Sequence, residues 1–185
     1  MASTTLSCAS LLSCVLLVSA CTQADGDYGF RIQQVHIQPA YQGLSTRYEQ
    51  ELSLSAEAVE ALEHGVPLTV QIDMELRDSL TLTLLTDHSR RFEIRYLPLS
   101  QHYRLTGLDD GSERTFPRLR HVLGALARLE LDFSTGPLAP GSYEFRVRTR
   151  IDNSRLPAPM QLPARFSSQW QHDSEWSTWP FEISA

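Results

Sequence analysis

LTVQIDMEL, residues 68–76, decides the fold class because apolar and polar side chains alternate along its whole length. The five apolar residues point one way and Thr69, Gln71, Asp73 and Glu75 the other, which is typical of a strand with one buried face. YEFRVRTRI, residues 143–151, repeats the pattern. Its inward set is Tyr143, Phe145, Val147, Thr149 and Ile151, and its outward set includes Arg146, Arg148 and Arg150. Two such strands predict a sheet that covers a core on one side.

Further segments extend this sheet pattern. SLTLTLL (79–85) and RFEIRYL (91–97) also alternate, and they flank TDHS (86–89), whose residues favour a turn. Weaker strands are expected at 30–38, 44–54, 101–107, 129–134, 160–168 and 178–183. Many short strands with turns between them predict a mainly β fold, an antiparallel two-sheet sandwich that is immunoglobulin-like in architecture.

Two short helices interrupt the strands. SAEAVEALEHG (55–65) offers Ser55 as its N-cap and ends at a glycine. TFPRLRHVLGALARL (115–129) offers Thr115 as its N-cap, Pro117 in the first turn and leucines at helical spacing. We expect both helices to cover the open ends of the sandwich.

Residues 1–20 have the features of a signal peptide. They contain no charged side chain, and their apolar run is too short to cross about 30 Å of hydrocarbon. Val18-Ser19-Ala20-Cys21 resembles the lipobox of bacterial lipoproteins, so we expect lipid attachment at Cys21. The alternative is ordinary secretory cleavage at the same bond, which releases a soluble protein.

This leader predicts the organisation and location of the chain. Residues 21–29 would be the lipidated N-terminus and tether, and 30–185 a single β-sandwich domain. By resemblance to the sorting rules of enteric-type bacteria, Thr22 rather than an aspartate at the second position favours the outer membrane. We therefore expect a lipid-anchored protein of the bacterial cell envelope that faces the periplasm, in the outer membrane rather than the inner. Cys8 and Cys14 leave with the leader, so core burial must hold the domain together without a disulfide.

Charge and motifs narrow the function classes. The net charge is −6, which argues against a nucleic-acid surface, and we expect no nucleic-acid partner. The phosphate-binding, dinucleotide, zinc-protease and nucleophile-elbow patterns are absent from the sequence, and the six histidines are scattered. We therefore expect no enzymatic activity, no catalytic residues, no metal and no cofactor. Asp87-His88-Ser89 is interpreted as a hairpin turn, and His172-Asp173-Ser174-Glu175 as a solvated loop.

Two sets of side chains are candidates for an interaction surface. Arg146, Arg148 and Arg150 could receive an acidic partner or lipid headgroups, but cross-strand pairs with Asp73 and Glu75 or with Glu93 are the favoured interpretation. Trp170, Trp176 and Trp179 could form a partner-binding surface, although core lids are the commoner role. Pro157, Pro159 and Pro163 predict an edge or loop before the last strand.

Most of the chain after Phe30 resembles a family of exported proteobacterial proteins known as a domain of unknown function (DUF4390). The likeness lies in LEHGVPLTV (62–70), FEIRYLPLSQHYRL (92–105), the helix after Phe116, and RLPAPMQLP (155–163) followed by the three tryptophans. The family supplies no catalytic residues. Its association with genes beside a sensor kinase of the nitrogen-regulation type implies a link to envelope signalling.

Three functional hypotheses follow. The first is a non-enzymatic, lipid-anchored cell-envelope protein whose sandwich binds another envelope protein and whose acyl chains hold it to the membrane. The second is a carrier or sensor of a small apolar ligand held between the sheets or beneath the helices. The third is a hydrolase, ranked last because no nucleophile with a plausible base is visible.

Overall fold

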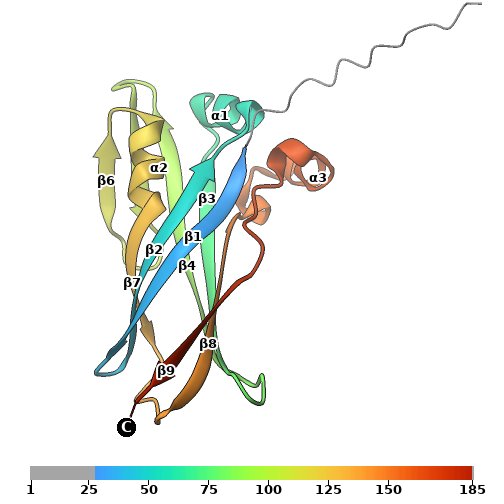
Figure 1. Ribbon diagram of the computed structural model, residues 1–185. Helices are drawn as coiled ribbons and strands as arrows, with labels where there is room; N and C mark the ends of the chain where they lie inside the picture. Colours follow the sequence, from blue (N-terminus) through green and yellow to red (C-terminus); the bar gives the residue numbers. More distant parts are fainter. Residues whose placement is uncertain (1–27, 185) are drawn as a thin grey trace, which may run out of the picture.

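The computed structural model describes residues 28–184, which form a sandwich of two antiparallel sheets (Figure 1). The smaller sheet has the strand order β1-β2-β7 and the larger one β6-β5-β4-β3-β8-β9. The predicted mainly β, two-sheet fold is confirmed. The signal peptide predicted for residues 1–20, the lipid attachment at Cys21 and most of the tether lie outside the described residues.

The chain passes from one sheet to the other three times, after β2, after β6 and after β7. The smaller sheet contains β1 (Gly29–Ala40), β2 (Gly43–Ser53) and β7 (Arg128–Ser134). The larger sheet contains β3 (Leu68–Asp78), β4 (Leu84–Leu97), β5 (His102–Gly107), β6 (Glu113–Phe116), β8 (Gly141–Ile151) and β9 (Ser177–Ile183). The helices are α1 (Ala56–Glu63), α2 (Leu119–Ala127) and α3 (Ala158–Phe166), with 3-10 turns η1 (Asn153–Arg155) and η2 (Ser168–Trp170).

The molecule has two distinct ends. In Figure 1, α1 and α3 lie at the end where β1 begins, whereas the β1–β2 and β3–β4 hairpins and the C-terminus lie at the opposite end. The two ends expose different side chains.

The core lies between the sheets, where the predicted inward residues of β3 and β8 are buried. Phe145 of β8 meets Phe133 of the opposite sheet edge to face, with ring centroids 5.5 Å apart. A polar link also crosses the interior. Thr149 donates its hydroxyl to Gln50 Oε1 at 2.7 Å, and Gln50 Nε2 donates to the Leu126 carbonyl at 2.8 Å. Paired in this way, the buried polar groups hold β2, α2 and β8 together.

The hairpin between β3 and β4 corrects the sequence prediction. Residues 79–83 form the turn, and β4 runs without a break through Asp87-His88-Ser89, which was predicted to be the turn. The Asp78 carboxylate explains the difference, because it accepts hydrogen bonds from the Leu80 and Thr81 amides at 3.0 and 2.8 Å. Such a local side-chain bond closes a turn within an alternating sequence.

The first predicted helix is confirmed, whereas the start of the second was misplaced. Ser55 Oγ accepts from the Ala58 amide at 3.2 Å, as expected of an N-cap. Thr115, the predicted cap of the second helix, instead lies in β6 opposite Arg104 of β5. Helix α2 therefore begins only after Pro117, at Leu119. The residues before Pro117 pair with the open edge of β5 instead of forming the first turn of the helix, as their local sequence had predicted.

The strand predicted at 160–168 is wrong, because this segment is helix α3. Pro159 lies in its first turn, where a missing backbone N–H costs little. Gln161 ties the helix back to the preceding turn by donating from Nε2 to the carbonyls of Ser154 and Leu156, each at 2.8 Å. The prolines indicated a break in the sheet correctly, but their spacing did not reveal that a helix replaces it.

Candidate functional site

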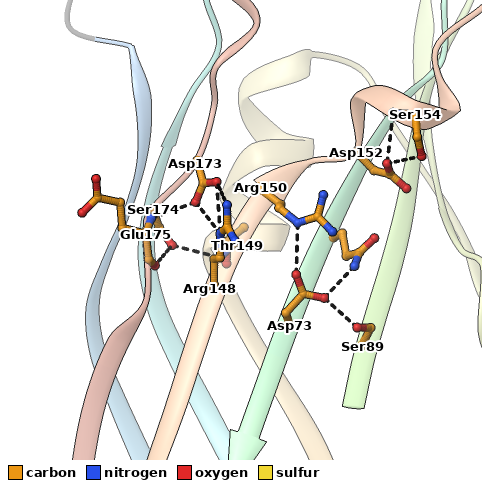
Figure 2. Close-up of polar contacts among 11 residues, drawn as sticks. Asp73, Ser89, Arg148, Thr149, Arg150, Asp152, Ser154, Asp173, Ser174 and Glu175 are labelled. Atoms are coloured by element: carbon orange, nitrogen blue, oxygen red, sulfur yellow. Dashed lines mark hydrogen bonds and ion pairs between the residues drawn. The ribbon is translucent and has the colours of Figure 1, made fainter. Parts of the chain in front are cut away.

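The arginine row lies on the outer face of β8, and carboxylates from β3 neutralise two of its members. Arg146 Nη1 lies 3.0 Å from Glu75 Oε2, and Arg150 Nε lies 3.1 Å from Asp73 Oδ2. Figure 2 shows Asp73 between Arg150 and Ser89, whose hydroxyl donates to the same carboxylate at 2.6 Å. The predicted cross-strand pairs with Asp73 and Glu75 are thus confirmed.

The third arginine, Arg148, binds a carboxylate that the sequence prediction did not consider. Asp173 belongs to residues 171–176, here called the cover segment, which runs antiparallel beside β8 before β9 begins. Both Asp173 oxygens accept from the Arg148 guanidinium, with Nε at 2.8 Å from Oδ1 (Figure 2). Arg148 is therefore held twofold, the strongest geometry available to an arginine and a carboxylate.

The charged forms of these pairs are stabilised. Burial raises the pKa of Asp173, but hydrogen bonds and charge from Arg148 outweigh it, so the pKa lies below its usual value. Burial likewise raises the pKa of Asp73, and hydrogen bonds from Gln71, Ser89 and Arg150 bring it below the ordinary range. The pKa of Arg148 is raised by its bonds to Asp173. The outer face of β8 is consequently a set of closed ion pairs rather than an unpaired row of cations.

His172 is buried, which corrects its prediction as part of a solvated loop. Only 2% of the residue is exposed, and its ring lies 5.4 Å from that of Tyr28 and 5.5 Å from that of Phe30. Its Nε2 accepts the Ser55 amide at 2.9 Å, so the neutral ring carries its proton on Nδ1. Burial lowers the pKa of His172 to about 4. This histidine fastens the cover segment to β1 and to the cap of α1.

The three tryptophans do not share one environment. Trp170 is buried in the core, and Trp179 is half-buried and packs against it. Trp176 lies beneath the Arg146 guanidinium, 5.0 Å from its carbon to the ring centroid. The structure thus gives Trp170 the role of a core lid. A partner surface formed by Arg146, Arg148, Arg150, Trp176 and Trp179 stays a prediction.

Two hollows on the surface are bordered mostly by charged and polar residues. One of about 630 Å³ opens beside Arg150, between η1 and the cover segment, with Asp152, Asn153 and Gln171 in its wall. Another of about 410 Å³ lies between β4, β5 and β7 and is bordered by Arg90 and Asp109. Charged side chains around a hollow suit water or small polar solutes better than an apolar ligand.

No three histidine, cysteine or acidic side chains within residues 28–184 converge in a way that could hold a metal ion. His88 lies in β4, where its Nε2 is 3.1 Å from the Ser134 carbonyl and its ring rests on Phe133. These contacts give His88 a packing role.

One exposed surface was not predicted from the sequence, and it is here called the leucine hairpin. It consists of Leu80, Leu82, Leu84 and Leu85 around the β3–β4 turn, and all four are exposed, Leu80 by 89%. Leu84 and Leu85 are neighbours on one strand, so both faces of the hairpin meet solvent and the hairpin extends beyond the sandwich. The expected strand at 79–85 had placed alternate leucines in the core. These leucines are exposed because the turn lies at residues 79–83, which the alternating sequence did not indicate.

Leu82 adopts a backbone conformation that its side chain disfavours. Its φ of 56° lies in the left-handed region. In tight hairpin turns this conformation is usually adopted by glycine or asparagine. A leucine there costs about 1–2 kcal/mol relative to the right-handed conformation. A strained and exposed apolar residue points to a constraint other than stability.

Comparisons with known proteins place the chain in a family. A family model described as a domain of unknown function (DUF4390) matches residues 27–180. No curated protein matches the chain. No solved structure matches it either. Among the helices of the described part, none has the length and apolar character needed to cross a membrane.

Proposed function

The chain belongs to the DUF4390 family, and we propose that it is a non-enzymatic, lipid-anchored cell-envelope protein that binds another envelope protein. The leucine hairpin is the surface that we assign to the partner. The observation that carries this proposal is Leu82, which is 57% exposed in a left-handed conformation that glycine would adopt at lower cost.

The position of the hairpin supports this role. β1 begins at one end of the sandwich and the leucine hairpin lies at the other (Figure 1). Acyl chains on Cys21 would therefore tether the end opposite the hairpin. An anchored molecule would direct its leucines away from its own membrane and towards proteins of the periplasm or the facing membrane.

Other surfaces support binding less well. The guanidinium groups of Arg146, Arg148 and Arg150 already bind carboxylates of the same chain, so an acidic partner would have to displace them. A carrier of small apolar ligands, the alternative function, receives less support because most residues that border the two hollows described above are charged or polar.

Photo-crosslinking in living cells tests the partner. A photoreactive residue at Leu82 should capture one or a few envelope proteins, whereas the same residue at Leu99 should not. Leu99 is the matched control because it is a fully exposed leucine in the turn between β4 and β5. Identical products from both positions, or no product from position 82, would contradict the proposal. Identification of the captured protein also tests the suggested link to envelope signalling.

Lipid attachment is tested separately. Cys21→Ser should abolish fatty-acid labelling and release the protein from membranes, because the thiol is the acceptor of the lipid. Cys14→Ser is the control, since residue 14 lies inside the predicted leader. Membrane retention of the Cys21→Ser protein would count against the anchor.

A further inference from the structure

Helix α3 turns its apolar side to solvent. Pro159, Leu162, Pro163 and Phe166 recur at the spacing i, i+3, i+4, i+7, which places them on one face, and all four are exposed. Leu162 is 64% exposed and Phe166 81%. Ala164 is buried against the body instead. A surface helix normally buries its apolar face, so this exposed apolar face indicates an interaction site.

The stretch of chain that contains α3 carries positive charge although the protein as a whole is negative. Residues 153–172, between Asp152 and Asp173, contain the two arginines Arg155 and Arg165 and no aspartate or glutamate, in a chain of net charge −6. Both arginines are exposed. An apolar face flanked by arginines, with an aromatic ring on it, is the composition of helices that lie in a membrane interface.

The helix also lies at the end of the sandwich where the described chain begins (Figure 1). The segment that follows α3 returns to this point, because the ring of His172 lies against those of Tyr28 and Phe30. Cys21 precedes Tyr28 by seven residues. Seven residues span at most about 25 Å, so lipid on Cys21 would keep this end within that distance of the bilayer.

We propose that the exposed face of α3, with Leu162 and Phe166 at its centre, rests on the phospholipid surface to which the chain is anchored. This inference depends on the lipid anchor proposed above and adds a second, apolar contact that orients the anchored body. The tether raises the local concentration of bilayer around α3, so a contact too weak to hold a free protein suffices here. Two contacts with the bilayer would fix the direction of the leucine hairpin.

Helix α1 lies at the same end, and its negative charge indicates how the molecule tilts on the membrane. Its Glu57, Glu60 and Glu63 are exposed, and acidic side chains are repelled by anionic phospholipid. The body should therefore lean towards α3 and hold α1 away from the surface. Charge therefore favours α3 over α1 as the helix that contacts the membrane.

Thiol labelling tests the contact on the mature lipoprotein. Phe166→Cys and Leu80→Cys place single thiols at the two ends, at positions of similar exposure, and the lipidated Cys21 has no free thiol to compete. Each protein is reconstituted in vesicles of phosphatidylethanolamine and phosphatidylglycerol and treated with a bulky, water-soluble maleimide. A contact populated about nine-tenths of the time should slow labelling at position 166 about tenfold relative to detergent solution. Labelling at position 80 should be equal in both.

The outcomes separate the contact from the anchor. Protein that sediments with vesicles but is labelled equally fast at both positions overturns the α3 contact and leaves the anchor intact. Protein that remains in the supernatant overturns both. Protection of position 166 in cells but not in vesicles would assign the face to a protein partner and overturn the lipid contact. Leu162→Asp added to Phe166→Cys should restore fast labelling in vesicles, and protection that survives this change would likewise contradict the proposal.

Discussion

The outer face of β8 and the leucine hairpin differ in how far the fold itself uses their side chains. On β8, the charged row of Arg146, Arg148 and Arg150 is occupied by carboxylates from β3 and from the cover segment. At the hairpin, four leucines meet solvent and one of them holds a disfavoured backbone conformation. Charge in a sequence therefore indicates a partner surface poorly when the fold supplies the counter-charges. Strain and exposure of apolar groups indicate it better.

The largest expected effect comes from the buried side of β8. Phe145→Ala should destabilise the protein by about 3–5 kcal/mol because it removes an aromatic ring that packs against the opposite sheet. Urea unfolding measures this loss. Leu82→Ala at the hairpin should change the free energy of unfolding by less than about 0.5 kcal/mol. Similar losses at both positions would contradict the distinction between the two regions.

The cover segment should respond to pH through His172. Because its folded pKa of about 4 lies below the unfolded value of 6.5, the unfolded state binds the proton more strongly, and stability falls as the pH drops from 6.5 towards 4. His172→Gln should cost about 2 kcal/mol at pH 7, and the cost should shrink as the pH falls through this window. Urea unfolding of the two proteins at pH 7 and pH 4.5 measures the loss of stability with pH and the cost of His172→Gln.

His36→Gln is the matched control for this prediction, since His36 is an exposed histidine on β1. It should leave the pH dependence between 6.5 and 4 as it is. A constant cost of His172→Gln across the window would show that the proton on His172 does not couple to folding.

Breaking the twofold ion pair should have a smaller effect. Asp173→Asn should cost about 1 kcal/mol, since both partners are partly exposed and solvent screens their attraction. The pKa of Asp173 is lowered in the folded state, so this contribution is present above the unfolded pKa and is lost as the pH falls through the folded value. Acid unfolding curves of the two proteins should therefore converge below about pH 4. Partner capture at position 82 should be unchanged, and its loss would move the binding surface to β8.

The smallest effect has the opposite sign. Leu82→Gly should leave stability unchanged or raise it by up to about 1 kcal/mol, because glycine adopts a φ of 56° without the cost that a side chain incurs. The same change should weaken partner capture from a photoreactive residue at Leu80. Thermal unfolding and crosslinking yield measure the two. A loss of stability would indicate that Leu82 serves the fold and would weaken the case for the hairpin.

Strand alternation made much of the fold predictable. LTVQIDMEL and YEFRVRTRI have a period of two over nine residues each, and their inner faces are buried as that period requires. The N-cap at Ser55 was also predictable, because it depends only on residues within the same helical turn. The cross-strand pairs with Asp73 and Glu75 followed because two alternating strands place opposite charges on the same face. Each of these features depends on neighbours close in sequence or on a single pairing.

The errors arose where distant segments compete. Thr115 could cap a helix or pair with β5, and the edge of β5 won. Residues 79–85 alternate like a strand, but the Asp78 carboxylate turns the chain there. His172 looked like part of a polar loop until its contacts with Tyr28, Phe30 and Ser55, all more than a hundred residues earlier, were in place.

By itself, the sequence determined that one side of many short extended segments is apolar, and burial of that side is enough to specify a mainly β sandwich. It also determined which side chains carry charge. Only the tertiary structure decided which of those charges are neutralised and which apolar residues stay outside, because both depend on segments that meet across the fold. The arginines of β8 became internal pairs in this way, and the leucine hairpin and α3 became the exposed surfaces.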